Sequence, residues 1–279
     1  MKKIADFFGQ SPKSPLFHYT TAEGFLSILD TKELWATSVR HLNDSSEFVH
    51  ALEKYSKHFE EVVAKKLHST INPVIDHMLN GAKRIAETDI PAHVISFSEQ
   101  GNQLSQWRAY SRGMNGISIG FGPDHFIFKN PNFKLVKCVY TDYEHNQLCE
   151  ALIESLAERE KRMDGHTDKD VKEFEAWAYD FAYLASAIKS EGFQEEQEWR
   201  LICLDRPNLG FRSGRFGIVP YLKLPLTSDY KSPIEFSQIV IGPCGNSSAA
   251  EAALKLLMDH KTDLIQNCTI EVSRIPFRD

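Results

Sequence analysis

The stretch from Ala92 to Phe121 constrains the fold more than any other part of the chain, because turn residues, aromatic side chains and strand-forming residues are densest there. His93–Ser98 is rich in β-branched and aromatic residues and is predicted to form a short strand. A polar turn and a short helix through Trp107 follow, since apolar residues recur there at a spacing of three. Ile117–Phe121 then alternates apolar and small residues, which is typical of a half-buried strand.

This order brings polar and aromatic side chains together, as in pockets that hold a flat polar ligand. The candidate pocket residues are Ser96, Ser98, Gln106, Trp107, Arg108 and Tyr110. The alternative interpretation is that Trp107 and Tyr110 belong to the core and that the serines only end a strand.

A second motif, FHYT, occupies Phe17–Thr20 directly before an apolar helical pattern. Thr20 followed by Glu23 fits a capping box, so a helix is expected to begin there. His18 and Tyr19 would then lie at a strand end beside a helix N-terminus, where backbone N–H groups attract an anionic or carbonyl-bearing ligand. The alternative for His18 is a hydrogen-bonded core histidine.

A third motif, EEQEWR, spans Glu195–Arg200. If the chain from Glu196 is extended, the two-residue period puts Glu196, Glu198 and Arg200 on one face. One such carboxylate can stabilise an oxocarbenium-like sugar while the other activates an acceptor or a water. Their proximity should raise one pKa, and Arg200 should oppose that rise. The alternative is a solvated strand face without chemistry.

Composition narrows the class of protein. The 279 residues are 42% hydrophobic and 25% charged, as in an ordinary globular protein, and the net charge of -6 gives no general attraction for nucleic acid or an anionic membrane. A local basic groove for nucleic acid is left open. No run approaches the roughly 18 apolar residues of a membrane span, and the N-terminus lacks the apolar region of a secretion signal. We therefore expect a cytoplasmic protein without a membrane partner.

The cysteines and histidines form no recognisable metal or redox motif. Five cysteines are widely spaced without a CxxC pair, and the eleven histidines include no HExxH pattern. We expect no metal, and we predict buried thiols in a reducing compartment. The cysteines are Cys138, Cys149, Cys203, Cys244 and Cys268.

The remaining patterns predict a mixed, mostly antiparallel α+β fold. Residues 1–15 are interpreted as a polar leader, and amphipathic helices are expected at 44–63 and 75–85. A helical insertion is expected at 146–189, with a core-facing apolar stripe in its second half. The stripe consists of Val171, Phe174, Ala178, Phe181, Ala185 and Ile188. One domain spanning 1–279, with this insertion inside it, fits best because the three motifs come from both ends and the middle.

Later segments are expected to be mostly strands. They are Glu198–Leu204, Phe216–Leu224, Phe236–Ile241 and Cys268–Val272. The first two are separated by a predicted loop, RPNLGFRSGR, and Ser248 with Glu251 is expected to cap a helix. Two weaker binding candidates are the polar cluster Arg40, His41 and Asn43, whose alternative is a capping loop, and the glycine-containing turn 242–246.

Together these motifs resemble a bacterial family of domains of unknown function. The resemblance rests on FHYT, SFS with SQWRAY, EExEWR and IGP, and it extends from about Leu16 to Pro243. More distantly, the order of a His-Tyr strand, a Ser-containing strand before an aromatic helix, and a Glu-x-Glu strand is similar to the ADP-ribosyltransferase fold. That likeness implies NAD as a substrate.

The likeness to ADP-ribosyltransferases also implies roles for single residues. The implied NAD-binding residues are His18, Tyr19, Thr20, Ser96, Ser98, Trp107, Tyr110 and Arg200. Among them, His18 would hold the ribose, the serines would shape the pocket, and Trp107 or Tyr110 would stack on a ring. Glu198 would be the catalytic carboxylate and Glu196 the acceptor-side carboxylate.

The implied function is an ADP-ribosyltransferase-like enzyme that transfers ADP-ribose from NAD to a macromolecule or to water, as a bacterial toxin or phage-defence effector. One alternative is a non-catalytic nucleotide- or protein-binding module with the same pocket. Another is a hydrolase of a glycosidic or phosphoester bond. Both enzymatic hypotheses require the two carboxylates to share an open cleft with His18.

Overall fold

A computed structural model describes most of the chain. The described residues are 3–42, 92–111, 116–162, 168–205, 208–214, 217–229, 231–261, 265–266 and 268–276. The helices expected at 44–63 and 75–85, and the candidate residue Asn43, lie outside these ranges.

Strands and helices both contribute to the described part of the chain. The main sheet contains β1 (Leu16–Thr21), β2 (Glu33–Ser38), β3 (His93–Ser98), β4 (Gly116–Phe121), β5 (Lys134–Lys137), β6 (Glu198–Cys203), β7 (Leu209–Gly214), β8 (Gly217–Pro225), β10 (Gln238–Ile241) and β12 (Thr269–Val272). A second, small sheet pairs β9 (Ile234–Glu235) with β11 (Ile265–Gln266). The α-helices are α1 (Ile4–Phe8), α2 (Ala22–Thr31), α5 (Leu104–Tyr110), α6 (Asp142–Glu160), α7 (Asp168–Ala185) and α8 (Ser247–His260). Short 3₁₀ helices are η1 (Val39–His41), η2 (Phe126–Lys129) and η3 (Glu191–Glu196).

The main sheet is mixed and mostly antiparallel, as predicted. Its order is β12-β10-β4-β1-β3-β2-β8-β7, with β6 pairing β3 and β5, and only β10 and β12 run parallel among these described pairs. β3 pairs with β6 along its whole length. Its other edge is shared, because β1 pairs at Ser98 and β2 pairs at His93 and Val94. The sheet therefore forks beside the middle of β3.

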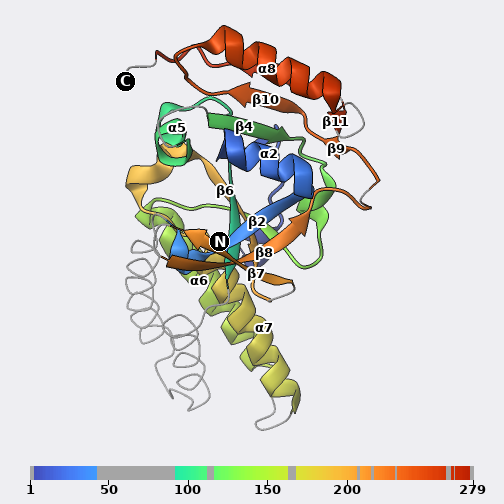
Figure 1. The fold of residues 1–279 in the computed structure, drawn as a ribbon. Helices are drawn as coiled ribbons and strands as arrows, with labels where there is room; N and C mark the ends of the chain where they lie inside the picture. Colours follow the sequence, from blue (N-terminus) through green and yellow to red (C-terminus); the bar gives the residue numbers. More distant parts are fainter. Residues whose placement is uncertain are drawn as a thin grey trace.

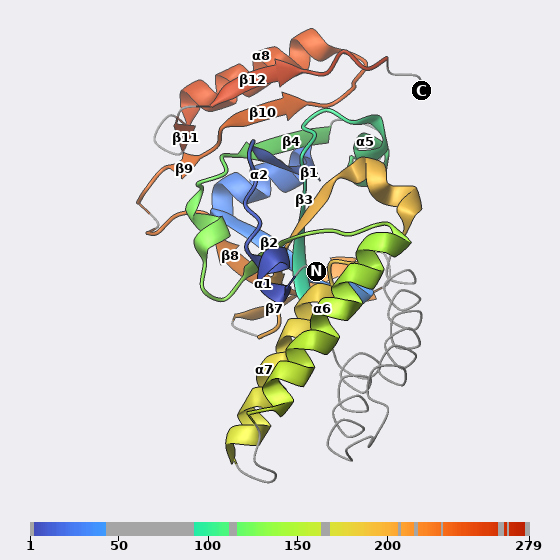
Figure 2. The ribbon, with the colours of Figure 1, turned by 180° about the vertical axis from the view of Figure 1, so that it is seen from behind.

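Hydrophobic residues pack on both faces of this sheet. One cluster joins Val94 and Ile202 to the helices α6 and α7, and the other joins Ile95 and Leu201 to α2 and α8. Figure 1 and Figure 2 show α8 lying along β10 and β12 at one end, while α6 and α7 run side by side away from the opposite end. The alternation of β3 and β6 thus sends successive side chains into two different cores.

The helix starts differ slightly from the expected ones. The N-cap of α2 is Thr21, whose Oγ1 accepts a hydrogen bond from the Gly24 N–H at 3.1 Å, so this helix starts one residue later than the Thr20 capping box predicted. The N-cap of α8 is Asn246 and not Ser248. In both cases a neighbouring short polar side chain meets the same requirement for an acceptor.

Two larger expectations were wrong, and a third was wrong for one residue. The polar leader contains α1, whose Phe7 is buried in the core. The predicted loop RPNLGFRSGR contains β7, which pairs with β8 as an edge strand and keeps its side chains largely exposed, so its sequence lacks a core-facing pattern. In the apolar stripe of α7, Ala178, Phe181 and Ala185 are buried as predicted, whereas Val171 is 55% exposed.

The two helices α6 and α7 form most of the helical segment that was expected between residues 146 and 189. α6 begins earlier than predicted, at a capping box in which Thr141 and Glu144 exchange hydrogen bonds.

None of the helices in the described ranges combines the length and apolar character needed to cross a membrane. Of the predicted buried thiols, Cys138, Cys149 and Cys203 are buried, while the two later cysteines are half-buried.

Candidate functional site

Two of the three motifs meet directly on β3. Antiparallel pairing sets Ser96 opposite Arg200 and Ser98 opposite Glu198. The Ser98 hydroxyl donates to the backbone carbonyl of Glu196 at 2.7 Å, 98 positions along the chain. The serine strand and the Glu-x-Glu segment are therefore neighbours, as expected from their order.

His18 joins the same strand from its other edge. Its Nδ1 lies 3.0 Å from the carbonyl oxygen of Ser96, beside the fork between β1 and β2. Because a carbonyl only accepts, Nδ1 carries the proton and Nε2 keeps its lone pair. Burial lowers the pKa of His18, and the hydrogen bond to Ser96 opposes this shift without cancelling it. The ring is therefore neutral near pH 7.

His18 and the carboxylates approach β3 from different faces. The ring of His18 packs near Phe97, with centroids 5.8 Å apart, and Phe97 belongs to the core under α2. Glu198 alternates with Trp199, so it faces the opposite core, beside α6 and α7. No direct contact between His18 and either carboxylate occurs among the described residues, so the expected shared pocket is not formed by these three side chains alone.

The carboxylates do share one side, although the expected continuous strand is absent. Glu196 ends the 3₁₀ helix η3, and β6 begins only at Glu198. Between them Gln197 takes a left-handed conformation with φ 44° and ψ 49°. This reversal, and not the two-residue period of a strand, turns both carboxylates toward the same cation.

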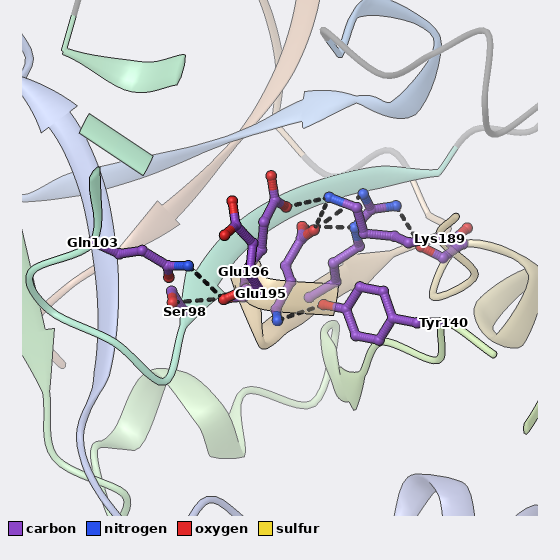
Figure 3. A network of polar contacts seen from close by, with 9 residues as sticks. Ser98, Gln103, Tyr140, Lys189, Glu195 and Glu196 are labelled. Carbon is purple, nitrogen blue, oxygen red and sulfur yellow. Dashed lines mark hydrogen bonds and ion pairs between the residues drawn. The ribbon is translucent and has the colours of Figure 1, made fainter. Parts of the chain in front are cut away.

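That cation is Lys189, from the loop between α7 and η3. Its ammonium group contacts both carboxylates, and Figure 3 shows Lys189 beside Glu196. Lys189 Nζ contacts Glu196 Oε2 and lies 2.6 Å from Glu198 Oε2. Arg200 completes the cluster, with Nε 2.8 Å from Glu198 Oε1 and Nη1 donating to the carbonyl of Ser186 at 2.8 Å.

These four charged groups are withdrawn from solvent. Lys189, Glu198 and Arg200 expose at most 5% of their side chains, and Glu196 exposes 11%. Desolvation raises the pKa of Glu198, but the combined charges and hydrogen bonds of Arg200 and Lys189 outweigh it and lower this pKa to about 2. Glu198 is therefore a permanent anion near neutral pH, so the predicted opposition by Arg200 prevails for this residue.

Backbone contacts hold the carboxylate segment from several sides. The phenolic oxygen of Tyr140 accepts from the Glu198 N–H at 2.7 Å, and burial raises the pKa of this tyrosine, which keeps it neutral. Gln103 Nε2 donates to the carbonyl of Glu195 at 2.6 Å. Together with Ser98, these side chains fix the turn that precedes β6 (Figure 3).

Two of the predicted ligand-binding residues, Tyr19 and Trp107, make contacts that hold the scaffold together. Tyr19 donates to the Gln100 carbonyl at 2.5 Å and accepts from the Gln103 N–H at 3.1 Å, which ties β1 to the start of α5. Trp107 is buried, packs edge-on against Tyr19 and donates to Asn102 at 2.9 Å. Its interpretation as a core residue is therefore the better one for its ring.

The other predicted residues occupy mixed positions. Tyr110 is partly buried against the cluster around Trp107, and Thr20 is half-buried at the end of β1. Gln106 is buried, whereas Arg108 is exposed on α5.

The two weaker candidates are described only in part, because Asn43 lies outside the described residues. Gly242 donates its N–H to the Gly116 carbonyl at 2.8 Å, so this glycine serves strand packing beside Trp107. Arg40 and His41 lie in η1, at the end of β2. Within the described ranges, no group of three or more potential metal ligands gathers.

Lys189 and Tyr140 were not predicted from the sequence. Lys189 follows the apolar stripe of α7 by one residue, and no periodic pattern distinguishes a buried lysine from a solvated one. Tyr140 lies between β5 and α6, where no motif in the sequence marks it. The only sequence signal for a cation such as Lys189 was the pair of nearby carboxylates, because a buried pair of anions requires cations from elsewhere in the fold.

Comparison with known proteins shows that part of the chain is similar to a family of unknown function, and it indicates no activity. Residues 106–201 match the model of a family described as a protein of unknown function, DUF2971. The expected likeness to a family of unknown function is confirmed for that segment, which runs from α5 into β6. No curated protein and no solved structure matches the chain.

Proposed function

We propose that the chain is an ADP-ribosyltransferase-like enzyme that binds NAD at the fork of the sheet. The observation that carries the proposal is the strand order β1-β3-β6, which sets the His-Tyr strand, the serine strand and the Glu-x-Glu strand side by side. The resemblance rests on these three segments in their order along the chain, and they come from three distant parts of the sequence.

The charge state of Glu198 suits one role in such a reaction. A carboxylate with a pKa of about 2 is a poor proton acceptor near pH 7, but it is a fixed negative charge. Within the described contacts, its Oε1 accepts only from Arg200, and a carboxylate oxygen can accept two hydrogen bonds. Because its side chain is only 5% exposed, the role proposed for Glu198 is to stabilise an oxocarbenium ion through its fixed charge.

The proposed transfer breaks one bond of NAD and forms one new bond at the same carbon. The glycosidic bond between the ribose C1′ and the nicotinamide nitrogen breaks, and neutral nicotinamide leaves with the bonding electron pair. A nucleophilic oxygen or nitrogen of the acceptor, or a water, then bonds to C1′ and releases its proton. Glu196 would face the acceptor. The His18 ring lies on the face of β3 opposite Glu198, so its Nε2 would accept a hydrogen bond from the ribose only with NAD extending through the fork between β1 and β2. Loss of NAD or modification of a macromolecule would harm a bacterial cell, which is the basis for a toxin or phage-defence role.

Thermal shift measurements with NAD, ADP-ribose and nicotinamide test the binding part of this proposal. Ligand at about 100 times its dissociation constant adds roughly 2.7 kcal/mol, or about 5 °C or more for a chain of this size. We expect a shift with NAD that His18→Ala removes and that the exposed control His260→Ala retains. Unchanged NAD turnover in Glu198→Gln would contradict the assignment of Glu198 as the catalytic carboxylate.

A non-catalytic nucleotide- or protein-binding module is the second candidate, and two observations favour it. Glu198 is buried in contacts with Lys189 and Arg200, as in a structural ion-pair cluster. His18 also reaches β3 from the face opposite Glu198. Binding of NAD without turnover would support this module as a nucleotide binder, and no shift with any of the three ligands would leave protein partners.

A further inference from the structure

We infer that the outer edge of β7 is a docking surface for a second copy of the chain, and that the two β7 strands pair antiparallel about a two-fold axis at Phe211. The inference concerns assembly, so it does not depend on NAD binding. It rests on the exposed apolar side chains of the β7–β8 hairpin, on the direction of the backbone groups of β7, and on the place of its one charged side chain.

The hairpin exposes large apolar side chains on one face. Phe211 is 64% exposed, Ile218 74% and Leu209 39%. The register sets Leu209 opposite Leu222, which belongs to the core beneath α2, and the two-residue period places Phe211 and Ile218 on that same face. The core surface therefore continues, uncovered, to the edge of the sheet, and exposed apolar side chains that adjoin one another mark interaction sites.

The backbone of β7 has groups that point away from the sheet. Pro220 lies opposite Phe211 and has no N–H, so this pair does not exchange two hydrogen bonds. Bonded and non-bonded pairs alternate along an antiparallel ladder, so the N–H and C=O of Phe211 point outward, as do those of Leu209 and Ser213. Among the residues that the structure describes, no backbone hydrogen bond reaches these outward groups. Such an edge is a template for another strand.

β7 lacks the features that normally protect an edge strand. It has neither lysine nor proline, and it pairs with β8 at six consecutive positions without a bulge. Its one charged side chain is Arg212, whose Nη2 donates to Thr37 Oγ1 on β2 at 2.9 Å. The guanidinium group therefore leans back across β8 and leaves the edge unguarded.

Self-complementarity favours a second copy as the partner. Two antiparallel copies of one strand are related by a two-fold axis, which requires that one residue lie opposite itself. With Phe211 on the axis, Leu209 lies opposite Ser213 of the copy, every outward group is paired, and the two phenylalanine rings lie side by side. An axis at Arg212 would set two guanidinium groups opposite each other and leave Leu209 unpaired.

The charges also fit the register centred on Phe211. It places Arg212 opposite Gly210 of the copy, so the two cations are kept apart. The ring of Tyr221 covers Gly210, since a Cβ atom at this glycine would lie 2.7 Å from Tyr221 Cζ. Each Arg212 thus has an aromatic ring of the copy as its neighbour, and the face of such a ring attracts a cation.

Light scattering coupled to size-exclusion chromatography tests the dimer. A single pair of edge strands makes a small interface, under about 1,200 Å² in total, so the dimer should form near 200 µM and dissociate near about 2 µM. Phe211→Lys puts a charge on the axis, and Ser213→Pro removes an outward N–H that β8 does not use. We expect both variants to be monomers throughout. Leu256→Lys is the matched control, because Leu256 is 70% exposed on α8, and it should dimerise like wild type.

Cross-linking tests the register. In an antiparallel bonded pair the Cα atoms lie about 5.5 Å apart, within the range of a disulfide, so Phe211→Cys should form a covalent dimer on mild oxidation. Ile218→Cys is the matched control. It lies on the same face, but three strand spacings, about 14 Å, separate the two copies of this residue. Wild type, with its five native cysteines, gives the background.

Three results would overturn the inference. A protein that stays monomeric at every concentration would do so, and it would leave an extended segment of another protein as the partner of this edge. A dimer that persists in both Phe211→Lys and Ser213→Pro, or that is also lost in Leu256→Lys, does not depend on β7. Cross-linking through Ile218→Cys but not through Phe211→Cys would exclude the antiparallel pairing centred on Phe211.

Discussion

The phenolic oxygen of Tyr140 accepts a hydrogen bond from the backbone N–H of Glu198 at 2.7 Å, across 58 positions of sequence. The Cys138 N–H donates to the carbonyl of the same glutamate at 2.9 Å. Both backbone polar groups of Glu198 are therefore paired with the segment that leads from β5 into α6. The position of the carboxylate is set by this segment as well as by the sheet.

Tyr140→Phe is expected to destabilise the fold by about 1–3 kcal/mol, because it leaves a buried backbone N–H without its acceptor. Urea unfolding measures this loss. Tyr143→Phe is the matched control, since it makes the same change three residues later in a side chain that is 70% exposed. Equal effects of the two substitutions would contradict the importance assigned to the Tyr140 contact.

Ser98→Ala is expected to cost a similar amount, about 1–3 kcal/mol. The Ser98 hydroxyl donates to the Glu196 carbonyl and accepts from the Gln100 N–H at 3.0 Å, and both groups lose a partner in the variant. Ser213→Ala, on the exposed edge strand β7, should stay within about 0.5 kcal/mol of wild type. A neutral Ser98→Ala would show that the turn before β6 does not depend on this contact.

The left-handed conformation of Gln197 predicts opposite effects for two substitutions. Gln197→Val should destabilise by about 1–2 kcal/mol, because a β-branched residue is strained at φ 44°. Gln197→Gly should leave stability unchanged or raise it by up to about 1 kcal/mol, since glycine adopts this conformation without strain. Chemical denaturation of both variants checks the order, and a more stable valine variant would exclude this backbone conformation.

Local patterns predicted the strands well. His93–Ser98 forms β3 with the predicted bounds, and Ile117–Phe121 lies in β4. In β3 alternating side chains fill a core on each face, so the pattern in the sequence and the burial in the fold have the same cause. β4 was predicted to be half-buried and is buried along its whole length, because its small residues Ser118 and Gly120 are covered as well. β7 was missed because an exposed edge strand has no buried face to impose such a pattern.

The candidate site was predictable only in part, because its decisive contacts are not local. The neighbourhood of Ser98 and Glu198 followed from the motifs, but the fold alone brings Lys189 between the carboxylates. The expected extended chain at Glu196 was wrong because Gln197 reverses direction without being a glycine. The face of Glu198 was open to interpretation as solvated, and it is covered because α6 and α7 pack there.

The pKa of Glu198 predicts how the protein responds to acid. This pKa is about 2 in the folded state, against an ordinary value of 4.5, so the unfolded state binds more protons between these values. The stabilisation from ionised Glu198 is therefore fully present above about pH 4.5 and is lost as pH falls toward 2. The lowered pKa values of Glu99 and Glu144 act in the same direction.

Unfolding measured from pH 7 to pH 2 tests this prediction. The free energy of unfolding should fall more steeply with acid in wild type than in Glu198→Gln, which has no carboxyl to protonate at this position. Glu158→Gln, an exposed control on α6, should keep the wild-type slope. Identical slopes in wild type and Glu198→Gln would mean that the ion pairs of Glu198 do not favour the folded state.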